Sequence, residues 1–213
     1  MERKRVVMAG VYLPGIYPRG DNSVEAHLLA PAFLKAYADA DPEIYENYEI
    51  IILNLPASLG AEQISSRIMF KKPHIVAYSV YVWNYDIVRE STKITRGEDP
   101  ALPIIWGGPQ VSYKPTEMMK ANPGVNIIVS GSGETRFKLL LKSNLNVKNL
   151  NEIPGITYRD ERGDIIENGG MIYEDLTKIP SPFQTKVIDL DDEKTHSVFI
   201  ETYRGCLFRC GYC

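Results

Sequence analysis

The sequence predicts an α/β fold built on a five-stranded parallel sheet, and two features of the residue pattern predict it. Short apolar runs rich in β-branched residues alternate with amphipathic segments, which is typical of consecutive βαβ units. These runs are apolar along almost their whole length, as expected of parallel strands whose two faces are both covered by helices. The expected strands are Arg5 to Val11, Tyr48 to Leu55, His74 to Val82, Leu102 to Trp106 and Val125 to Ser130.

The segments between these strands have the residue spacing of helices that bury one face. In the first of them, Leu28, Ala32 and Phe33 share a face. Pro31 should kink this helix or delay its start, because proline lacks a backbone N–H. The expected helices run from Ser23 to Ala38, Ala61 to Phe70, Tyr85 to Thr95, Thr116 to Ala121 and Glu134 to Leu141.

The pattern changes after residue 150. Residues 155–158 and 164–167 are rich in β-formers and flank the turn Asp160-Glu161-Arg162-Gly163. Two such segments joined by a tight turn predict a β-hairpin, which we expect to lie outside the sheet.

An extended connector follows the hairpin. Pro180 and Pro182 have a fixed φ and no backbone N–H, which suits a connector better than a sheet or a helix. A last strand is expected from Ser197 to Thr202. We therefore expect a first domain over residues 1–150, a hairpin and linker over residues 151–195, and the start of a further domain over residues 196–213.

Composition excludes several classes of function. The 213 residues contain 24 lysines and arginines against 27 aspartates and glutamates, a formal charge of −3, so the basic excess of nucleic-acid-binding proteins is missing. No stretch approaches the roughly 20 apolar residues that cross a bilayer. A dinucleotide site is disfavoured, because Val11-Tyr12-Leu13-Pro14-Gly15 stands where Gly-x-Gly-x-x-Gly would be needed.

All three cysteines lie in the last eight residues, at Cys206, Cys210 and Cys213. A disulfide between any two of them would not link distant parts of the chain. We therefore expect a reducing, cytoplasmic setting. On a glycine-containing loop the three thiolates can converge on one centre. A [4Fe–4S] cluster ordinarily takes four cysteines, so three would leave one iron open to a small molecule. The alternatives are zinc completed by His196 or a partner, and three unligated surface thiols.

Two glycine-rich loops follow the fourth and fifth expected strands. They are Gly107-Gly108-Pro109-Gln110 and Gly131-Ser132-Gly133-Glu134. Glycine lets the backbone approach a bulky ligand, and ligands of open α/β sheets bind beyond the carboxyl ends of the strands. The alternative is that both loops are ordinary turns, and that Tyr81 and Trp83 are packing aromatics.

The cysteine segment resembles the signature of the radical S-adenosylmethionine (SAM) superfamily. The resemblance rests on Cys-x3-Cys-x2-Cys after an expected strand, on Arg204-Gly205 before it, and on Tyr212 before the last cysteine. It implies that Cys206, Cys210 and Cys213 hold a [4Fe–4S] cluster and that SAM binds its fourth iron, with Tyr212 beside the adenine. In this family an electron from the cluster cleaves SAM to a 5′-deoxyadenosyl radical.

A second resemblance covers the preceding part of the chain. Residues 79–84 and the two glycine loops resemble the loops of cobalamin (B12)-binding domains fused ahead of radical SAM barrels, and residues 153–159 and 179–182 resemble their hairpin and linker. The resemblance implies a flavodoxin-like sheet that holds the corrin over its strand ends. The implied cobalamin contacts are Ser79, Tyr81, Trp83, Gly107, Gly108, Gln110, Gly131, Gly133 and Glu134.

His27 is the candidate for a ligand of cobalt. Methyl-carrier B12 domains use Asp-x-His-x-x-Gly after the first strand, and Glu25-Ala26-His27 keeps a carboxylate two residues before a histidine but lacks the glycine. The alternative is a histidine on a helix face, with water or another side chain below the cobalt.

Together the resemblances imply the N-terminal part of a cobalamin-dependent radical SAM enzyme, by family default a methyltransferase. They imply a small-molecule or peptide substrate and an electron donor such as flavodoxin or ferredoxin. From the charge balance and the lack of a long apolar stretch we expect no nucleic acid or membrane as partner. Residues 196–213 would begin a truncated radical SAM domain, with the first strand of its TIM-like barrel. We therefore expect this chain to bind cobalamin without turning over substrate. The alternatives are a stand-alone cobalamin carrier or sensor, and a flavodoxin-like domain for another ligand with zinc in the tail.

Overall fold

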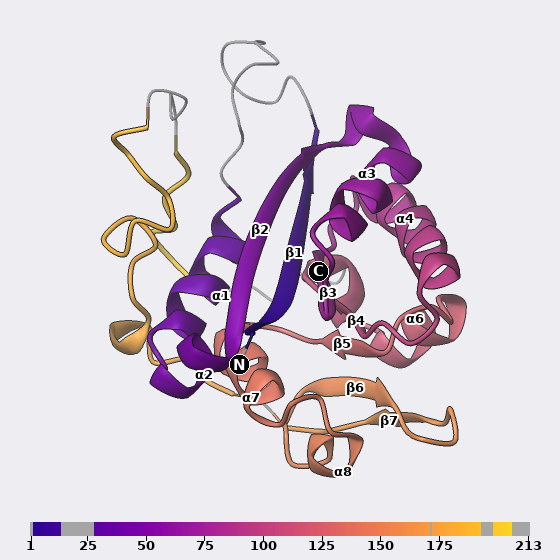
Figure 1. Cartoon of the computed structure of the whole chain (residues 1–213). Coiled ribbons are helices and arrows are strands. Elements are labelled where there is room, and N and C mark those ends of the chain that lie inside the picture. Colours follow the sequence, from indigo (N-terminus) through magenta and orange to yellow (C-terminus); the bar gives the residue numbers. More distant parts are fainter. Residues whose placement is uncertain (1, 14–27, 171, 193–197, 206–213) are drawn as a thin grey trace.

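The computed structural model describes residues 2–13, 28–170, 172–192 and 198–205. The described strands form one sheet in the order β2-β1-β3-β4-β5-β6-β7 (Figure 1). The predicted parallel part is confirmed, since the first five strands of this order pair in parallel. These strands are β1 (Lys4–Tyr12), β2 (Tyr48–Pro56), β3 (Ile75–Ser79), β4 (Ile104–Gly107) and β5 (Ile127–Val129).

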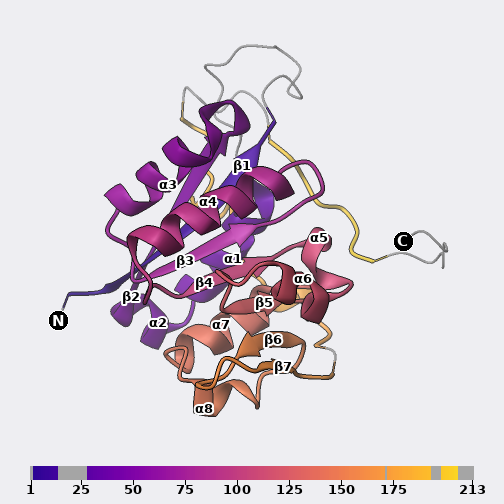
Figure 2. The same ribbon diagram turned by 90° about the vertical axis from the view of Figure 1, so that its right-hand side faces the viewer.

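Helices cover both faces of the sheet, as the continuous apolarity of the strands predicts. On one face α1 (Leu29–Asp39) packs beside α7 (Glu134–Lys142), and on the other α3 (Gly60–Phe70) packs beside α4 (Tyr85–Glu98) (Figures 1 and 2). Each face has its own buried apolar cluster. The shorter helices are α2 (Pro42–Asn47), α5 (Pro109–Ser112), α6 (Pro115–Ala121), α8 (Val147–Leu150), η1 (Ala57–Leu59) and η2 (Leu176–Lys178).

The bounds of several elements differ from their predictions, and the differences at α1 and β3 bear on the site. The described part of α1 begins at Leu29 with Pro31 in its first turn, where a missing N–H breaks no hydrogen bond, and the predicted start at Ser23 lies outside the described residues. Strand β3 ends at Ser79 instead of Val82, because residues 81–84 turn away from the sheet.

The predicted hairpin is formed by β6 (Ile156–Arg159) and β7 (Ile165–Glu167), but its expected place outside the sheet is wrong. Strand β6 pairs antiparallel with β5 and extends the sheet. The physical reason is burial, since Ile156 and Tyr158 continue the apolar cluster under α7. The hairpin also covers an edge of β5 that would otherwise have unpaired backbone groups.

The strand predicted from Ser197 to Thr202 is not formed at residues 198–202, which are the described part of it. A strand needs a neighbour to accept its backbone hydrogen bonds. In the described chain no strand pairs with this segment, and its side chains Phe199 and Ile200 are 50% and 71% exposed.

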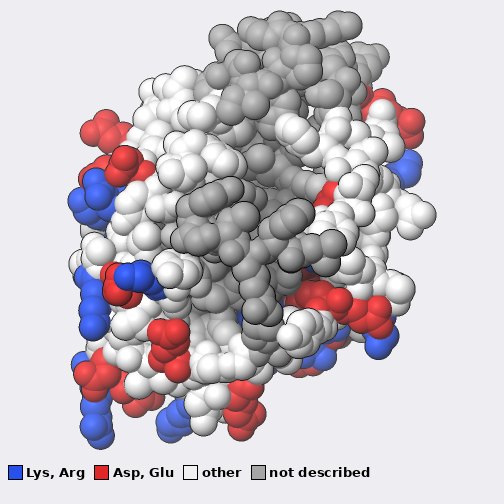
Figure 3. Space-filling view, turned by 180° about the vertical axis from the view of Figure 1, so that it is seen from behind, with Lys and Arg blue, Asp and Glu red and all other residues white. Residues whose placement is uncertain are grey.

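The surface carries charges of both signs. Acidic and basic side chains lie interspersed on the face seen from behind in Figure 3, in keeping with the net charge of −3. Within the described ranges, no helix combines the length and the apolarity that crossing a bilayer requires.

Replacing Gly108 with alanine is expected to destabilise the fold by about 3 kcal/mol. Gly108 has a φ of +111°, and a Cβ there would lie 2.5 Å from the backbone oxygen of Val80. Both the left-handed backbone and the contact between main chains therefore require glycine. Urea unfolding checks this, with Gly97→Ala as the control, because a Cβ at Gly97 in α4 meets nothing within 4 Å. Equal stability of both variants would contradict this account of Gly108.

Acid is expected to weaken the contact between α7 and the start of α2. The Oδ2 of Asp41 lies 2.9 Å from Nζ of Lys142 and 3.0 Å from Nζ of Lys138. The hydrogen bond from Lys142, helped by Lys138 and opposed by burial, lowers the pKa of Asp41 from 3.8 to about 2. Because the pKa is lower in the folded state, the stabilisation is present above about pH 4 and is lost as the pH falls towards about 2.

Replacing Asp41 with asparagine should therefore cost about 1 kcal/mol at neutral pH and flatten this acid dependence. Unfolding measured between pH 2 and 7 checks this. The exposed Asp86→Asn serves as the control. A variant that keeps the wild-type acid profile would show that the lysine contacts do not stabilise the fold.

Candidate functional site

A cavity of about 1650 Å³ opens at the carboxyl ends of β1, β3, β4 and β5. Strands β1 and β3 are neighbours in the sheet. The chain runs from β1 to β2 on one side of this pair, and from β3 to β4 on the other side. Ligands of open α/β sheets bind at such a switch point. The cavity exceeds the roughly 300–1,000 Å³ of ordinary small-molecule pockets, so it suits a large ligand.

The floor of the cavity is apolar. Met8, Ala77, Ile105 and Val129 come from four adjacent strands and belong to the cluster on the α1–α7 face. Side chains of α1 and α7 form the wall beside this floor. An apolar floor under an open rim of loops favours a flat ligand with an apolar body and polar edges.

The structure brings together eight of the nine predicted cobalamin contacts around this cavity. The predicted contacts that line it are Ser79, Tyr81, Gly107, Gly108, Gln110, Gly131, Gly133 and Glu134. The ninth, Trp83, is not among the lining residues. Its ring stacks on that of Tyr81 with 4.4 Å between centroids, and half of its surface is exposed. Trp83 therefore supports Tyr81 from outside the cavity.

Gly107 leaves space that the fold itself does not need. A Cβ at this position would meet nothing closer than the backbone oxygen of Val129, at 3.8 Å, and its backbone is not in the left-handed region. Gly107 alternates with Trp106 and so shares a strand face with Ile105, which lines the cavity. Glycine at 107 therefore keeps the cavity open, whereas its neighbour Gly108 is required by the turn.

Asn84 holds the loop that carries Tyr81, a role that was not predicted from the sequence. It is 1% exposed. Its Nδ2 donates to the backbone oxygens of Val11 and Ser79, each at 3.0 Å, and its Oδ1 accepts from the backbone N of Tyr81 at 2.8 Å. Asn84 thus ties the ends of β1 and β3 together. An asparagine directly before an expected helix would have suggested an N-cap, but the side chain of Asn84 makes no capping hydrogen bond to α4.

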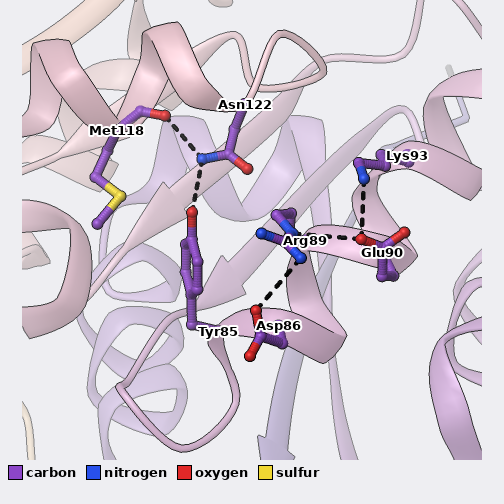
Figure 4. Close-up of polar contacts among 7 residues, drawn as sticks. All are labelled: Tyr85, Asp86, Arg89, Glu90, Lys93, Met118 and Asn122. Atoms are coloured by element: carbon purple, nitrogen blue, oxygen red, sulfur yellow. Dashed lines mark hydrogen bonds and ion pairs between the residues drawn. The ribbon is translucent and has the colours of Figure 1, made fainter.

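Tyr85 also lines the cavity, and polar contacts fix its position at the start of α4 (Figure 4). Its hydroxyl accepts a hydrogen bond from Nδ2 of Asn122 at 3.1 Å, and the same amide donates to the backbone oxygen of Met118 at 2.8 Å. Its ring meets that of Trp106 edge to face, with 6.1 Å between centroids. The first turn of α4 is therefore fixed to α6, while the charged side chains of Asp86 and Glu90 pair with neighbours on the outer surface.

Arg204 enters the site from the C-terminal segment. Its Nη1 lies 2.7 Å from Oε1 of Glu134, the first residue of α7, and its Nε lies 2.7 Å from Oε2 of Glu201. Burial alone would lower the pKa of Arg204, but the two carboxylates outweigh it and raise the pKa. In the sequence Arg204 belongs to the cysteine motif, and its partner Glu134 lies 70 residues away without a local signal.

The predicted cluster ligands Cys206, Cys210 and Cys213, the predicted SAM contact Tyr212, and both His27 and His196 lie outside the described residues. Among the residues that are described, no group of three or more histidine, cysteine, aspartate or glutamate side chains is arranged to hold a metal ion.

Two curated relatives resemble the chain along most of its length. It is 26% identical over 208 residues to 2-(S-pantetheinyl)-carbapenam-3-carboxylate methyltransferase of Streptantibioticus cattleyicolor. The aligned region covers 93% of this chain and 30% of that protein. It is also 26% identical over 208 residues, with the same coverage, to the cobalamin-dependent radical SAM methyltransferase TokK of Streptomyces tokunonensis. The chain thus spans 30% of the length of both relatives.

A solved structure shares the fold. The cobalamin-dependent S-adenosylmethionine radical enzyme OxsB, with aqua-cobalamin and S-adenosylmethionine bound, matches with a TM-score of 0.62 at 19% identity, over 85% of this chain and 24% of that one. The parallel sheet of this chain is therefore that of cobalamin-binding Rossmann-like domains. The family model of the B12 binding domain matches residues 24–141, more than half of the sequence, and the chain therefore belongs to the B12-binding domain family.

Proposed function

We propose that this chain is the cobalamin-binding part of a cobalamin-dependent radical SAM enzyme, with the corrin held in the cavity at the strand ends. The observation that carries the proposal is the cavity itself, whose size, apolar floor and open Gly107 position suit a corrin. Membership of the B12-binding domain family supports it independently. When bound, cobalamin supplies an exchangeable methyl group to the reaction.

The residues of the chain would bind and orient the corrin. The floor residues Met8, Ala77, Ile105 and Val129 offer an apolar surface that excludes water from one face of the ring. Gly107 allows the ring to approach the end of β4, and Gln110 offers a polar side chain to its amide edges. The carboxylate of Glu134 is engaged by Arg204 and borders the site from the first turn of α7.

We further propose that Cys206, Cys210 and Cys213 ligate a [4Fe–4S] cluster whose open iron takes SAM, with Tyr212 beside the adenine. The support is the cysteine spacing together with relatives that are named as radical SAM enzymes. Three thiolates are one ligand short of the usual four, which suits a cluster that also binds a small molecule. Free thiolates of this kind suit a reducing compartment, and we place the protein in the cytoplasm.

Methyl transfer is our proposal for the whole protein. Two relatives that span this chain are named as methyltransferases, whereas another, of Synechocystis, is named as an anaerobic magnesium-protoporphyrin IX monomethyl ester cyclase. The proposed substrate is a small molecule or a peptide, and the proposed electron donor is a flavodoxin or a ferredoxin. The second candidate function is a cobalamin carrier or sensor, which is favoured by the fact that the described residues by themselves form a cavity of this size.

Anaerobic reconstitution separates these functions. The purified chain is incubated with ferrous iron, sulfide and hydroxocobalamin, desalted, and analysed for iron, cobalt and visible absorbance. Our proposal predicts that corrin and iron are both retained, with about four irons per chain. Corrin without iron would support the carrier. Loss of both, with zinc bound instead, would contradict both functions and favour a domain for another ligand.

A further inference from the structure

Residues 198–205 contribute to the cavity although they begin about 30 residues after the last strand of the sheet. Glu201, Arg204 and Gly205 all line it. The guanidinium of Arg204 lies 5.2 Å above the ring of Phe33 in α1, and it pairs with Glu134 in α7. One side chain thus contacts both helices that form the wall.

The contact between Arg204 and Glu134 is shielded from water. The side chain of Glu134 is 6% exposed and that of Arg204 is 20% exposed. A buried carboxylate is costly without a partner, so removal of either charge should weaken the contact strongly. The position of Glu134 in the first turn of α7 adds a favourable interaction with the helix dipole.

The linker is attached at the same turn of α7. The carboxylate of Glu174 accepts hydrogen bonds from the backbone N of Thr135 at 3.1 Å and from its hydroxyl at 2.6 Å. The first turn of α7 therefore holds two points of the segment that leads towards the cysteines. Of these two contacts, the Arg204–Glu134 pair is the one whose residues both line the cavity.

We propose that Arg204 is a positioning residue that couples the cavity to the cysteine segment. Its ion pair with Glu134 docks residues 198–205 onto the cavity wall, so that corrin binding and docking strengthen each other. In the sequence Arg204 stands two residues before Cys206, and two residues span about 7 Å at most. The pair therefore fixes the residues directly before the proposed cluster ligands at the wall of the proposed corrin site. This inference rests on the proposed function.

The coupling can be measured from either side. If docking of residues 198–205 raises the affinity for corrin by some factor, corrin binding raises the docking equilibrium by the same factor. Corrin should slow hydrogen exchange in residues 198–205, and an intact docking contact should tighten corrin binding.

Hydrogen exchange of residues 198–205 tests the inference, together with absorbance titration with hydroxocobalamin. The main variant is Arg204→Met, which keeps an apolar stem against Phe33 but removes the charge. It should exchange faster in these residues without any ligand, lose the slowing caused by hydroxocobalamin, and bind hydroxocobalamin about 10-fold more weakly. Glu134→Gln should have the same effects, and the double variant should be no worse than either single one.

Two further variants separate positioning from general stability. Arg204→Lys should restore part of the corrin-dependent slowing, because it keeps the charge but not the planar fork. Lys178→Met, at an exposed ion pair of the linker, should match the wild type in every respect.

The inference is overturned if Arg204→Met leaves the ligand-free exchange of residues 198–205 unchanged, or if hydroxocobalamin slows this exchange as much as in the wild type. Failure of the proposed function has a different signature. In that case the wild type retains no corrin, while the faster ligand-free exchange of Arg204→Met still reports the docking contact.

Discussion

Replacement of Cys206, Cys210 and Cys213 together with alanine is expected to abolish iron uptake and to leave hydroxocobalamin binding unchanged. Thiolates are the ligands that iron–sulfur clusters require, so no cluster should form without them. In the described chain the cavity is lined by residues between Met8 and Gly205, upstream of the three cysteines in the sequence. The measurement is iron and cobalt per chain after anaerobic reconstitution.

The control for this variant is Leu207→Ala, which changes the same segment but keeps all three thiols. It should take up iron and corrin like the wild type. Iron retained by the triple alanine variant would refute the proposed ligands. Loss of corrin along with iron would show that the two sites do not form independently.

Replacement of Gly107 with phenylalanine is expected to weaken hydroxocobalamin binding by at least about 100-fold, since overpacking of a filled site costs about 3 kcal/mol. The Cβ would meet only ordinary contacts, with Val129 at 3.8 Å or beyond, so the ring would occupy the cavity without disturbing the strand. Far-UV circular dichroism and the urea midpoint should stay as in the wild type. Absorbance titration measures the affinity.

Neighbouring positions make this test specific. Gly107→Ala should have a smaller effect on affinity in the same direction, because it adds only a methyl group. Gly108→Ala should instead lower stability, because its Cβ would meet the backbone of Val80. Wild-type affinity in the phenylalanine variant would mean that the corrin does not lie over the end of β4.

The sheet and the glycine loops could be predicted because their signals are local. Strands buried on both faces are continuously apolar, and the apolar runs at residues 50–53 and 104–106 predict such strands. Once the strands are parallel, the loops after β4 and β5 must meet at one edge of the sheet. The cavity lining therefore followed from the order of the motifs along the chain.

Trp83 shows where a local signal misleads. A strand continued to Val82 would put Tyr81 and Trp83 two residues apart, with their side chains on the same face. The chain turns after Ser79, and the amide of Asn84 fixes that turn through bonds to three separate backbone groups. Tyr81 therefore lines the cavity, whereas Trp83 stacks behind it.

Long-range pairs were beyond prediction from sequence. The pairing of β6 with β5 depends on which edge of the sheet is free, and the pairing of Arg204 with Glu134 depends on the path of the linker. Neither leaves a periodic pattern in the residues concerned. Both nevertheless determine the site, since β6 completes the sheet beside β5 and Arg204 closes one side of the cavity.

The central claim is that the cavity at the strand ends takes up a corrin, and equilibrium dialysis of the purified chain against hydroxocobalamin tests it most directly. The account predicts saturation at about one corrin per chain, which remains bound when the protein is passed through a desalting column. A protein that emerges colourless, or that binds no more corrin than its Gly107→Phe variant, would contradict it.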